Sequence, residues 1–369
     1  MVLVAIISSL AGLEVGLFFI FPFLISVLLV MGYDKLVALS ATLGATIVGM
    51  FGSTFSNTLY SAGNQTLSLT MTDGIWAKVI LLVLGLGLLV FFTLDYAKKN
   101  QGKKDKNLLA DIAEIKEDKS KDKKALWPMI LIVDLVLLVL ILGTTSWDLI
   151  FGSNWFTTAY TWLMELKIGE FAIFSKLFGN IPAFGTWTGP MRFQYYSVFM
   201  LVGIVALALV YKIKPGECFD AFVNGVKKYL VPALLVIVAY SVFVFVFYFP
   251  VFNTIGTWIM QLAEEFNVAL MGLFTLIGSV FYPDFYYYSY YTLSYVGQVA
   301  GDANLYPLAN IMFTSLYSLA MLVAPTSALM LLSLSVTNVS YKEWLKYIWK
   351  LFLALLIVAF IVFSILLLV

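Results

Sequence analysis

The chain has 369 residues, of which 62% are hydrophobic and only 12% are charged, and its formal net charge is +1. Soluble domains carry about 25% charged residues, so this composition indicates a membrane protein, and the near-zero net charge argues against a nucleic-acid partner. The sequence contains one cysteine and no histidine, which excludes an internal disulfide, cysteine-based metal sites and histidine-dependent catalysis. It also has no phosphate-binding loop or nucleophile motif, so we expect neither an enzyme nor a cofactor.

Several apolar runs approach the ~20 residues that a helix needs to cross a bilayer. Backbone groups in lipid must be satisfied within the segment, so these runs predict helices. We therefore predict an all-α polytopic protein of the plasma or inner membrane, with spans near 36–55, 76–96, 128–143, 193–211, 229–249, 305–336 and 348–369.

The first 31 residues are too long for one straight span, and Gly12, Glu14, Gly16 and Pro22 interrupt them. A re-entrant hairpin or broken helix fits this pattern, and a single tilted, kinked helix is the alternative. A second long segment, residues 266–302, is rich in aromatic residues and is interrupted at 282–284. It predicts a second hairpin.

Residues 97–126 form a lysine-rich aqueous segment, which the positive-inside rule places in the cytoplasm, with a surface helix expected within Leu108–Lys119. Further lysines at 212–228 and 342–350 predict two more inside loops. All three loops lie inside only if the two hairpins open to opposite sides of the membrane, which is typical of an inverted repeat. No span precedes the first hairpin, so we expect the first repeat to lack its N-terminal helices.

This count divides the chain into four regions. We predict a first transport region at 1–96, the cytoplasmic linker at 97–126, scaffold-like spans at 127–263 and a second transport region at 264–369. A short interfacial helix is expected at 157–166, in a region rich in aromatic residues, and residues 253–262 are expected to lie at the membrane interface.

Two acids within apolar segments are candidates for a binding site, because an ionisable side chain in the bilayer core is costly. Glu14 lies at the first break, and its alternative role is an internal hydrogen bond. Asp284 lies among six tyrosines, where it could face a cationic solute group with aromatic faces beside it. The alternative for Asp284 is an exposed place in an interfacial aromatic belt.

Two polar interruptions of apolar spans occupy corresponding places in the two halves. Freed backbone carbonyls at such breaks bind Na⁺, and half-helix N-termini face carboxylates. Ordinary capping and helix packing are the alternative roles. The candidate residues are Gly52, Ser53, Thr54, Ser56 and Asn57 in the first half and Pro325, Thr326 and Ser327 in the second, with a sodium site considered near Ser53, Asn57 and Thr326.

Arg192 is the only arginine of the chain and follows Gly189-Pro190 at the start of a span. We expect it to anchor lipid headgroups. With two acids and no well-placed basic residue, the predicted site favours a cationic amino acid over a dicarboxylate. An Arg192 that faced the cavity would reverse this preference.

These motifs together resemble the YfcC family, a branch of the ion transporter superfamily near the anaerobic dicarboxylate carriers. The resemblance rests on the order and spacing of residues 12–22, 32–34, 44–57, 96–99, 219–232, 325–327 and 341–346. It implies a scaffold domain, a moving transport domain with two re-entrant hairpins, a homodimer in the lipid bilayer and ion-coupled movement of a small solute. The tip at 283–288 departs from the serine- and glycine-rich tip of that family.

We therefore expect a secondary transporter of an amino acid, by arginine/ornithine-type exchange or by uptake coupled to Na⁺ or H⁺. A carrier of dicarboxylates or other organic anions with the same fold is the first alternative. A non-transporting membrane subunit or truncated fragment is the second, and a lipid-modifying enzyme is the least favoured because no nucleophile–base pair is evident.

Overall fold

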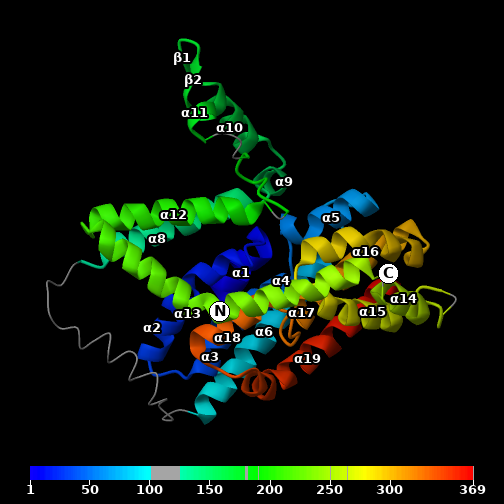
Figure 1. Cartoon of the computed structure of the whole chain (residues 1–369). Helices are drawn as coiled ribbons and strands as arrows, with labels where there is room; N and C mark the ends of the chain where they lie inside the picture. The colour runs from blue at the N-terminus through cyan, green and yellow to red at the C-terminus, as the bar shows by residue number, and fades with distance from the viewer. Residues whose placement is uncertain (101–124, 179–181, 190, 250, 264, 369) are drawn as a thin grey trace.

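The computed structural model describes residues 1–100, 125–178, 182–189, 191–249, 251–263 and 265–368, and these are mostly helical (Figure 1). The predicted helix within Leu108–Lys119 lies outside these residues. The chain is a multi-pass membrane protein, because helices in the described part are long and apolar enough to span a bilayer. They are α6 (Ile75–Lys99), α8 (Trp127–Thr144), α12 (Arg192–Val210), α13 (Pro215–Tyr248) and α19 (Tyr341–Leu368).

The N-terminal segment is broken where the sequence predicted. Helix α1 (Val2–Ala11) ends at Gly12, and a short 3-10 turn, η1 (Gly16–Ile20), leads into α2 (Phe21–Val30). Gly12 has φ 62°, in the left-handed region that glycine favours. A Cβ at Gly12 would lie 2.1 Å from the Ser56 hydroxyl oxygen, so this position requires glycine for space as well. The alternative of one continuous kinked helix is therefore wrong.

A second break follows the next helical run, which consists of α3 (Lys35–Leu39), the π-helical turn η2 (Ser40–Gly44) and α4 (Ala45–Phe51). The run stops at Gly52, and α5 (Asn57–Leu67) begins after it. The Ser56 hydroxyl accepts a hydrogen bond from the Leu59 amide at 3.3 Å and caps α5. This helix was not among the predicted elements, because its sequence is polar rather than apolar.

The second half contains a similar pair of breaks. Helices α15 (Val268–Phe281) and α16 (Phe285–Ala300) flank residues 282–284, and a short turn, η3 (Ala303–Leu305), follows. Helices α17 (Tyr306–Ala320) and α18 (Ala328–Thr337) flank residues 321–327. Both predicted interruptions are confirmed, and the side chains of Asp284 and Ser327 cap the helices that follow them.

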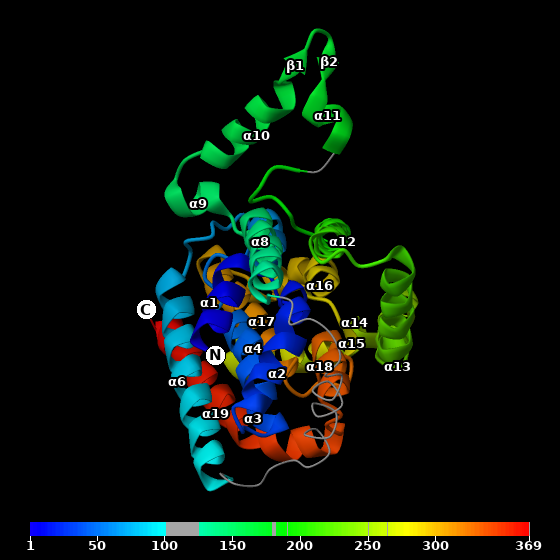
Figure 2. The same cartoon turned by 90° about the vertical axis from the view of Figure 1, so that its left-hand side faces the viewer.

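The two interrupted spans form the centre of the molecule. Every residue of α4 is buried, as is α17 from Leu308 to Ala320. A helix that is buried all round is enclosed by protein rather than lipid. Helix α4 packs against α1, α6 and α17, while α17 also packs against α15 and α19. Helices α8 and α12 pack against each other, beside this core (Figure 2).

A small arm projects from the helical body (Figures 1 and 2). It contains α9 (Trp147–Phe151), α10 (Trp155–Glu165), the strands β1 (Lys167–Ile168) and β2 (Phe171–Ala172), and α11 (Ile173–Phe178). The antiparallel pairing of β1 with β2 is a minor departure from the predicted all-α class. The predicted short helix at 157–166 corresponds to α10, and most of the segment 253–262, which was predicted only to be interfacial, lies in α14 (Val251–Met260).

Several of the lysines that were predicted to lie in loops lie on helices. Helix α13 begins at Pro215 and contains Lys227 and Lys228, while α19 begins at Tyr341 and contains Lys342 and Lys346. Proline is favoured at the first helical position and lysine is a good helix former. The helices therefore begin well before their apolar stretches.

Candidate functional site

The first break is held by the last turn of α1. The Ser9 carbonyl accepts hydrogen bonds from the amides of Thr54 and Phe55, at 3.1 and 3.3 Å. The Ser9 hydroxyl donates to the Gly52 carbonyl at 2.9 Å and accepts from the Thr54 amide at 3.1 Å. Polar backbone that an interrupted helix exposes must find such partners in a membrane. Ser9 thus fixes the shape of the chain just before α5.

The second break is held in a related way. The Thr326 hydroxyl donates to the Val280 carbonyl, in the last turn of α15, at 2.7 Å. The Trp344 indole of α19 donates to the Leu322 carbonyl at 2.8 Å. The Ser327 hydroxyl accepts from the Met330 amide at 3.4 Å and caps α18. The hydroxyl residues predicted at this break are therefore engaged with backbone groups.

A cavity of about 50 Å³ lies where the breaks meet. The first turns of α5, α16 and α18 all reach it, and its polar lining includes Glu14, Thr58, Arg192, Asp284 and Ser327. A single water needs about 10–15 Å³, and ligand pockets begin near 300 Å³. The cavity thus has room for a few water molecules, and entry of a solute requires the surrounding elements to separate.

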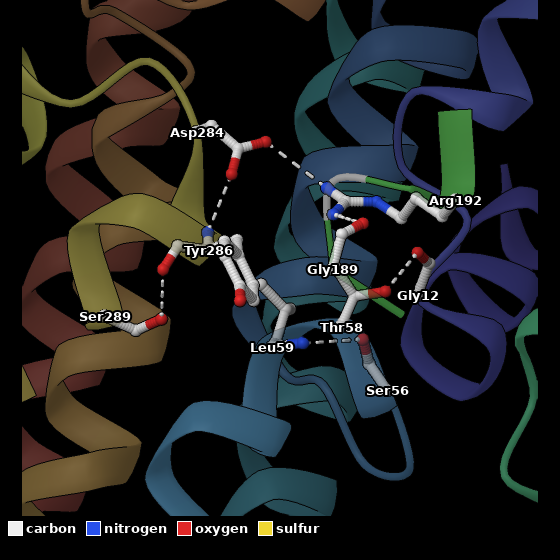
Figure 3. A network of polar contacts seen from close by, with 9 residues as sticks. All are labelled: Gly12, Ser56, Thr58, Leu59, Gly189, Arg192, Asp284, Tyr286 and Ser289. Atoms are coloured by element: carbon white, nitrogen blue, oxygen red, sulfur yellow. Dashed lines mark hydrogen bonds and ion pairs between the residues drawn. The ribbon is translucent and has the colours of Figure 1, made fainter. Parts of the chain in front are cut away.

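Arg192 lines this cavity and does not anchor headgroups, so that expectation was wrong. Its side chain is 3% exposed, and Nη2 lies 3.3 Å from the Asp284 carboxylate oxygen Oδ2. Nη1 donates to the Gly189 carbonyl at 2.7 Å (Figure 3), and the guanidinium lies 4.4 Å from the centre of the Phe193 ring. These contacts turn the first residue of α12 inward, away from lipid.

Asp284 has two partners. Its Oδ1 accepts from the Tyr286 amide at 2.9 Å and caps α16, while Oδ2 faces Arg192 (Figure 3). At 8% exposed it is buried, which contradicts the alternative of an exposed interfacial aspartate. The neighbouring tyrosines mainly pack on other aromatic rings. For example, Tyr288 is buried against Phe313, and its hydroxyl donates to the Thr275 carbonyl.

Glu14 is the second acid of the cavity lining. It is 5% exposed, and its Oε1 has no hydrogen-bond partner among the described residues. A buried carboxyl oxygen without a partner is costly and calls for an explanation. The predicted internal hydrogen bond to a neighbouring helix is therefore not made by this atom, which leaves it available to a proton, an ion or a solute.

The other predicted residues are not among those that line the cavity. Ser53, Thr54, Ser56 and Thr326 are buried and shape the breaks. Gly52 packs against α6, where a Cβ would lie 2.2 Å from the Leu82 amide nitrogen. Pro325 lies within the second break. Asn57 begins α5, and its side chain lies outside what the structure describes.

Ser9 was not singled out from the sequence, and Arg192 was considered at the cavity only as the alternative to a headgroup anchor. The Thr58 hydroxyl donates to the Gly12 carbonyl at 3.2 Å (Figure 3) and ties α5 to the first break. The rarity of arginine in this chain was a usable signal for Arg192. Nothing in the local sequence distinguished Ser9 from serines that cap ordinary helices or donate to a carbonyl of their own helix.

Groups of both charge signs gather at the cavity. A helix N-terminus carries roughly half a positive charge and presents unpaired amides. The N-termini of α5, α16 and α18 meet here beside Arg192, and this positive field is opposed by Glu14 and Asp284. Among the described residues no group of three or more Cys, Asp or Glu side chains gathers that could hold a metal ion.

The family model of the C4-dicarboxylate anaerobic carriers (DcuC) matches residues 1–368 of the chain. No curated protein and no solved structure was found to match. The match supports the dicarboxylate alternative over the amino acid that the sequence analysis favoured, and the narrower YfcC assignment stays a prediction. The chain belongs to the C4-dicarboxylate anaerobic carrier family, which is a family of membrane transporters.

Proposed function

We propose that this chain is a secondary carrier that binds a C4 dicarboxylate at the cavity between its breaks. The observation that carries the proposal is the position of Arg192, which lies buried at a cavity that three helix N-termini also reach. Arginine presents a planar fork of N–H donors that matches a carboxylate. Helix N-termini supply further amides for a second carboxylate.

The hypothesis that the carrier binds a cationic amino acid loses its main support at this cavity. It depended on two unpaired acids near the midplane, whereas Asp284 is engaged by Arg192 and by the cap of α16. An Arg192 that faced the cavity was expected to reverse the preference toward a dicarboxylate, and Arg192 lines the cavity.

Two internal similarities support an inverted repeat with two re-entrant hairpins. Ser56 and Ser327 cap the helices that restart after each interrupted span. In both halves the residue before that serine donates to the last turn of an earlier helix. The Phe55 amide donates to the Ser9 carbonyl of α1, and the Thr326 hydroxyl donates to the Val280 carbonyl of α15. In this proposal α1–α2 and α15–α16 are the two hairpins.

The arrangement also supports a moving transport region made of residues 1–96 and 264–369. Helices α8, α12 and α13, within 127–263, would be the scaffold, with much of their surface exposed for lipid or for a second subunit. We further propose a homodimer in the plasma membrane with residues 97–126 in the cytoplasm. Coupling would use H⁺ on Glu14, whose Oε1 has no partner in the described part of the chain, or Na⁺ near the breaks.

The test is counterflow of radiolabelled succinate into proteoliposomes that are preloaded with unlabelled succinate or fumarate. We expect labelled uptake by the wild type. We expect its loss in Arg192→Gln, and strong reduction in Arg192→Lys because an ammonium cannot form the bidentate pair. The matched control is Lys214→Gln, which removes an exposed cation before α13 and should leave counterflow unchanged.

Wild-type counterflow in Arg192→Gln would remove the cavity from the mechanism. Counterflow of arginine against ornithine, without counterflow of succinate, would restore the amino-acid reading. No counterflow of either class would favour the non-transporting subunit.

A further inference from the structure

The ion pair between Arg192 and Asp284 joins the start of α12 to the cap of α16, across the proposed binding cavity (Figure 3). We propose that Asp284 is a built-in competitor of the substrate: it holds Arg192 in the empty carrier, and a substrate carboxylate displaces it. This inference rests on the proposed function. It assigns to Asp284 the role of setting the affinity for the dicarboxylate.

The geometry of the pair makes displacement feasible. Arg192 and Asp284 share one contact of 3.3 Å, which is long for a charge-assisted hydrogen bond and lacks the second bond of a bidentate pair. Asp284 holds the Tyr286 amide more closely, at 2.9 Å. Asp284 therefore keeps its role as the cap of α16 when Arg192 leaves, so the carboxylate retains one partner.

Arg192 also keeps a partner during the exchange. Its Nη1 donates to the Gly189 carbonyl, three residues back on the same chain, at 2.7 Å. This bond fixes the position of the guanidinium independently of Asp284. A guanidinium has five N–H donors, so the N–H group that Asp284 releases can donate to an incoming carboxylate while Nη1 keeps its bond to the Gly189 carbonyl.

The charges in the cavity lining require such an exchange. Among the described residues that line the cavity, Arg192 is the one basic side chain, and Asp284 already engages one of its N–H groups. A substrate carboxylate can form a bidentate pair with this guanidinium only when Asp284 releases that group. A substrate carboxylate is matched only in the place that Asp284 occupies.

The pair also lies at a close seam between two elements. A Cβ added at Gly189 would lie 3.4 Å from the ring of Tyr286, so the loop before α12 packs on the first turn of α16. Displacement of Asp284 removes the charge contact across this seam. Binding is thereby linked to separation of α12 from α16, which the small cavity requires for entry.

The test uses Asp284→Asn in the full chain, purified in detergent, with binding of radiolabelled succinate measured directly. Asparagine caps helices as well as aspartate does, so the variant removes the charge and keeps the cap of α16. We expect succinate to bind about tenfold more tightly than to the wild type, since a competing charged hydrogen bond is lost. Asp284→Ser, which also caps, should act in the same direction if the asparagine variant folds poorly.

The matched control is Asp302→Asn, because Asp302 also caps a turn, through the Asn304 amide at 2.9 Å, but is exposed. It should bind succinate as the wild type does. Unchanged or weaker binding in both neutral Asp284 variants, with normal succinate counterflow by the wild type, would overturn this inference alone. Absence of succinate binding and counterflow in every protein would overturn the proposed function and this inference with it.

Discussion

Replacement of Ser9 by alanine tests how the first break is held. The Ser9 hydroxyl donates to the Gly52 carbonyl at 2.9 Å and accepts from the Thr54 amide at 3.1 Å, in a fully buried place. Hydrogen bonds between membrane helices contribute about 0.6 kcal/mol each on average. A buried carbonyl left without a partner adds about 1–3 kcal/mol.

We therefore expect Ser9→Ala to lower the free energy of unfolding by roughly 1.5–3 kcal/mol. The Thr54 amide keeps the Ser9 carbonyl as an acceptor. The loss of unfolding free energy should therefore stay below the sum of the largest hydrogen-bond contribution and the largest cost of an unpaired carbonyl. The α5 N-terminus should also be less well positioned, and succinate counterflow should fall.

The assay is titration of the purified protein with SDS, followed by tryptophan fluorescence, with counterflow measured in parallel. Ser26→Ala is the matched control, because the Ser26 hydroxyl donates to the Pro22 carbonyl of its own helix in an exposed place. That variant should stay within about 0.5 kcal/mol of the wild type. An equally small change in Ser9→Ala would refute the account of the break.

Three further predictions concern the breaks and the acid beside them. Gly12→Ala should prevent stable folding, because Gly12 has φ 62° and a Cβ there would lie 2.1 Å from the Ser56 hydroxyl oxygen. The control Gly32→Ala, at φ 92° in open space, should cost only backbone strain of about 1 kcal/mol. Equal thermal unfolding temperatures of the two variants would contradict this prediction. Glu14→Gln should keep succinate counterflow but lose accumulation driven by a pH gradient, and wild-type accumulation would exclude Glu14 as the proton carrier. Thr326→Ala should reduce counterflow with normal membrane insertion, while Thr337→Ala, whose hydroxyl bonds only carbonyls of its own helix, should behave as the wild type.

The breaks could be predicted because they depend on local chemistry. Glycine, proline and clusters of hydroxyl residues interrupt apolar runs in ways that the backbone of a membrane helix tolerates only at special places. Gly12, Gly52 and Pro325 gave this signal, and the structure interrupts the helices at all three. The apolar spans were predictable for the same reason, since length and composition decide them.

The environment of Arg192 could not be predicted from its local sequence. An arginine at the start of a span anchors headgroups in many proteins, and only tertiary packing turns this one toward Asp284, 92 positions later in the chain. The preference for a cationic amino acid followed from that error, because it counted the acids without their partner.

Helix α5 was not predicted, and the start of α13 was placed too late in the chain. Hydropathy marks where a span is apolar, whereas α5 and α13 begin in polar sequence that capping and first-turn residues favour. Ser56 and Pro215 supply those local signals.

The most direct test of the central claim is a counterflow competition with the wild-type carrier. Proteoliposomes loaded with succinate would take up labelled succinate in the presence of excess external fumarate, arginine or acetate. The account predicts that fumarate abolishes labelled uptake, because it competes for Arg192 and the helix N-termini with two carboxylates, and that arginine and acetate leave uptake nearly unchanged. Inhibition by arginine with no effect of fumarate would contradict the account, because it would mean that the cavity selects cations.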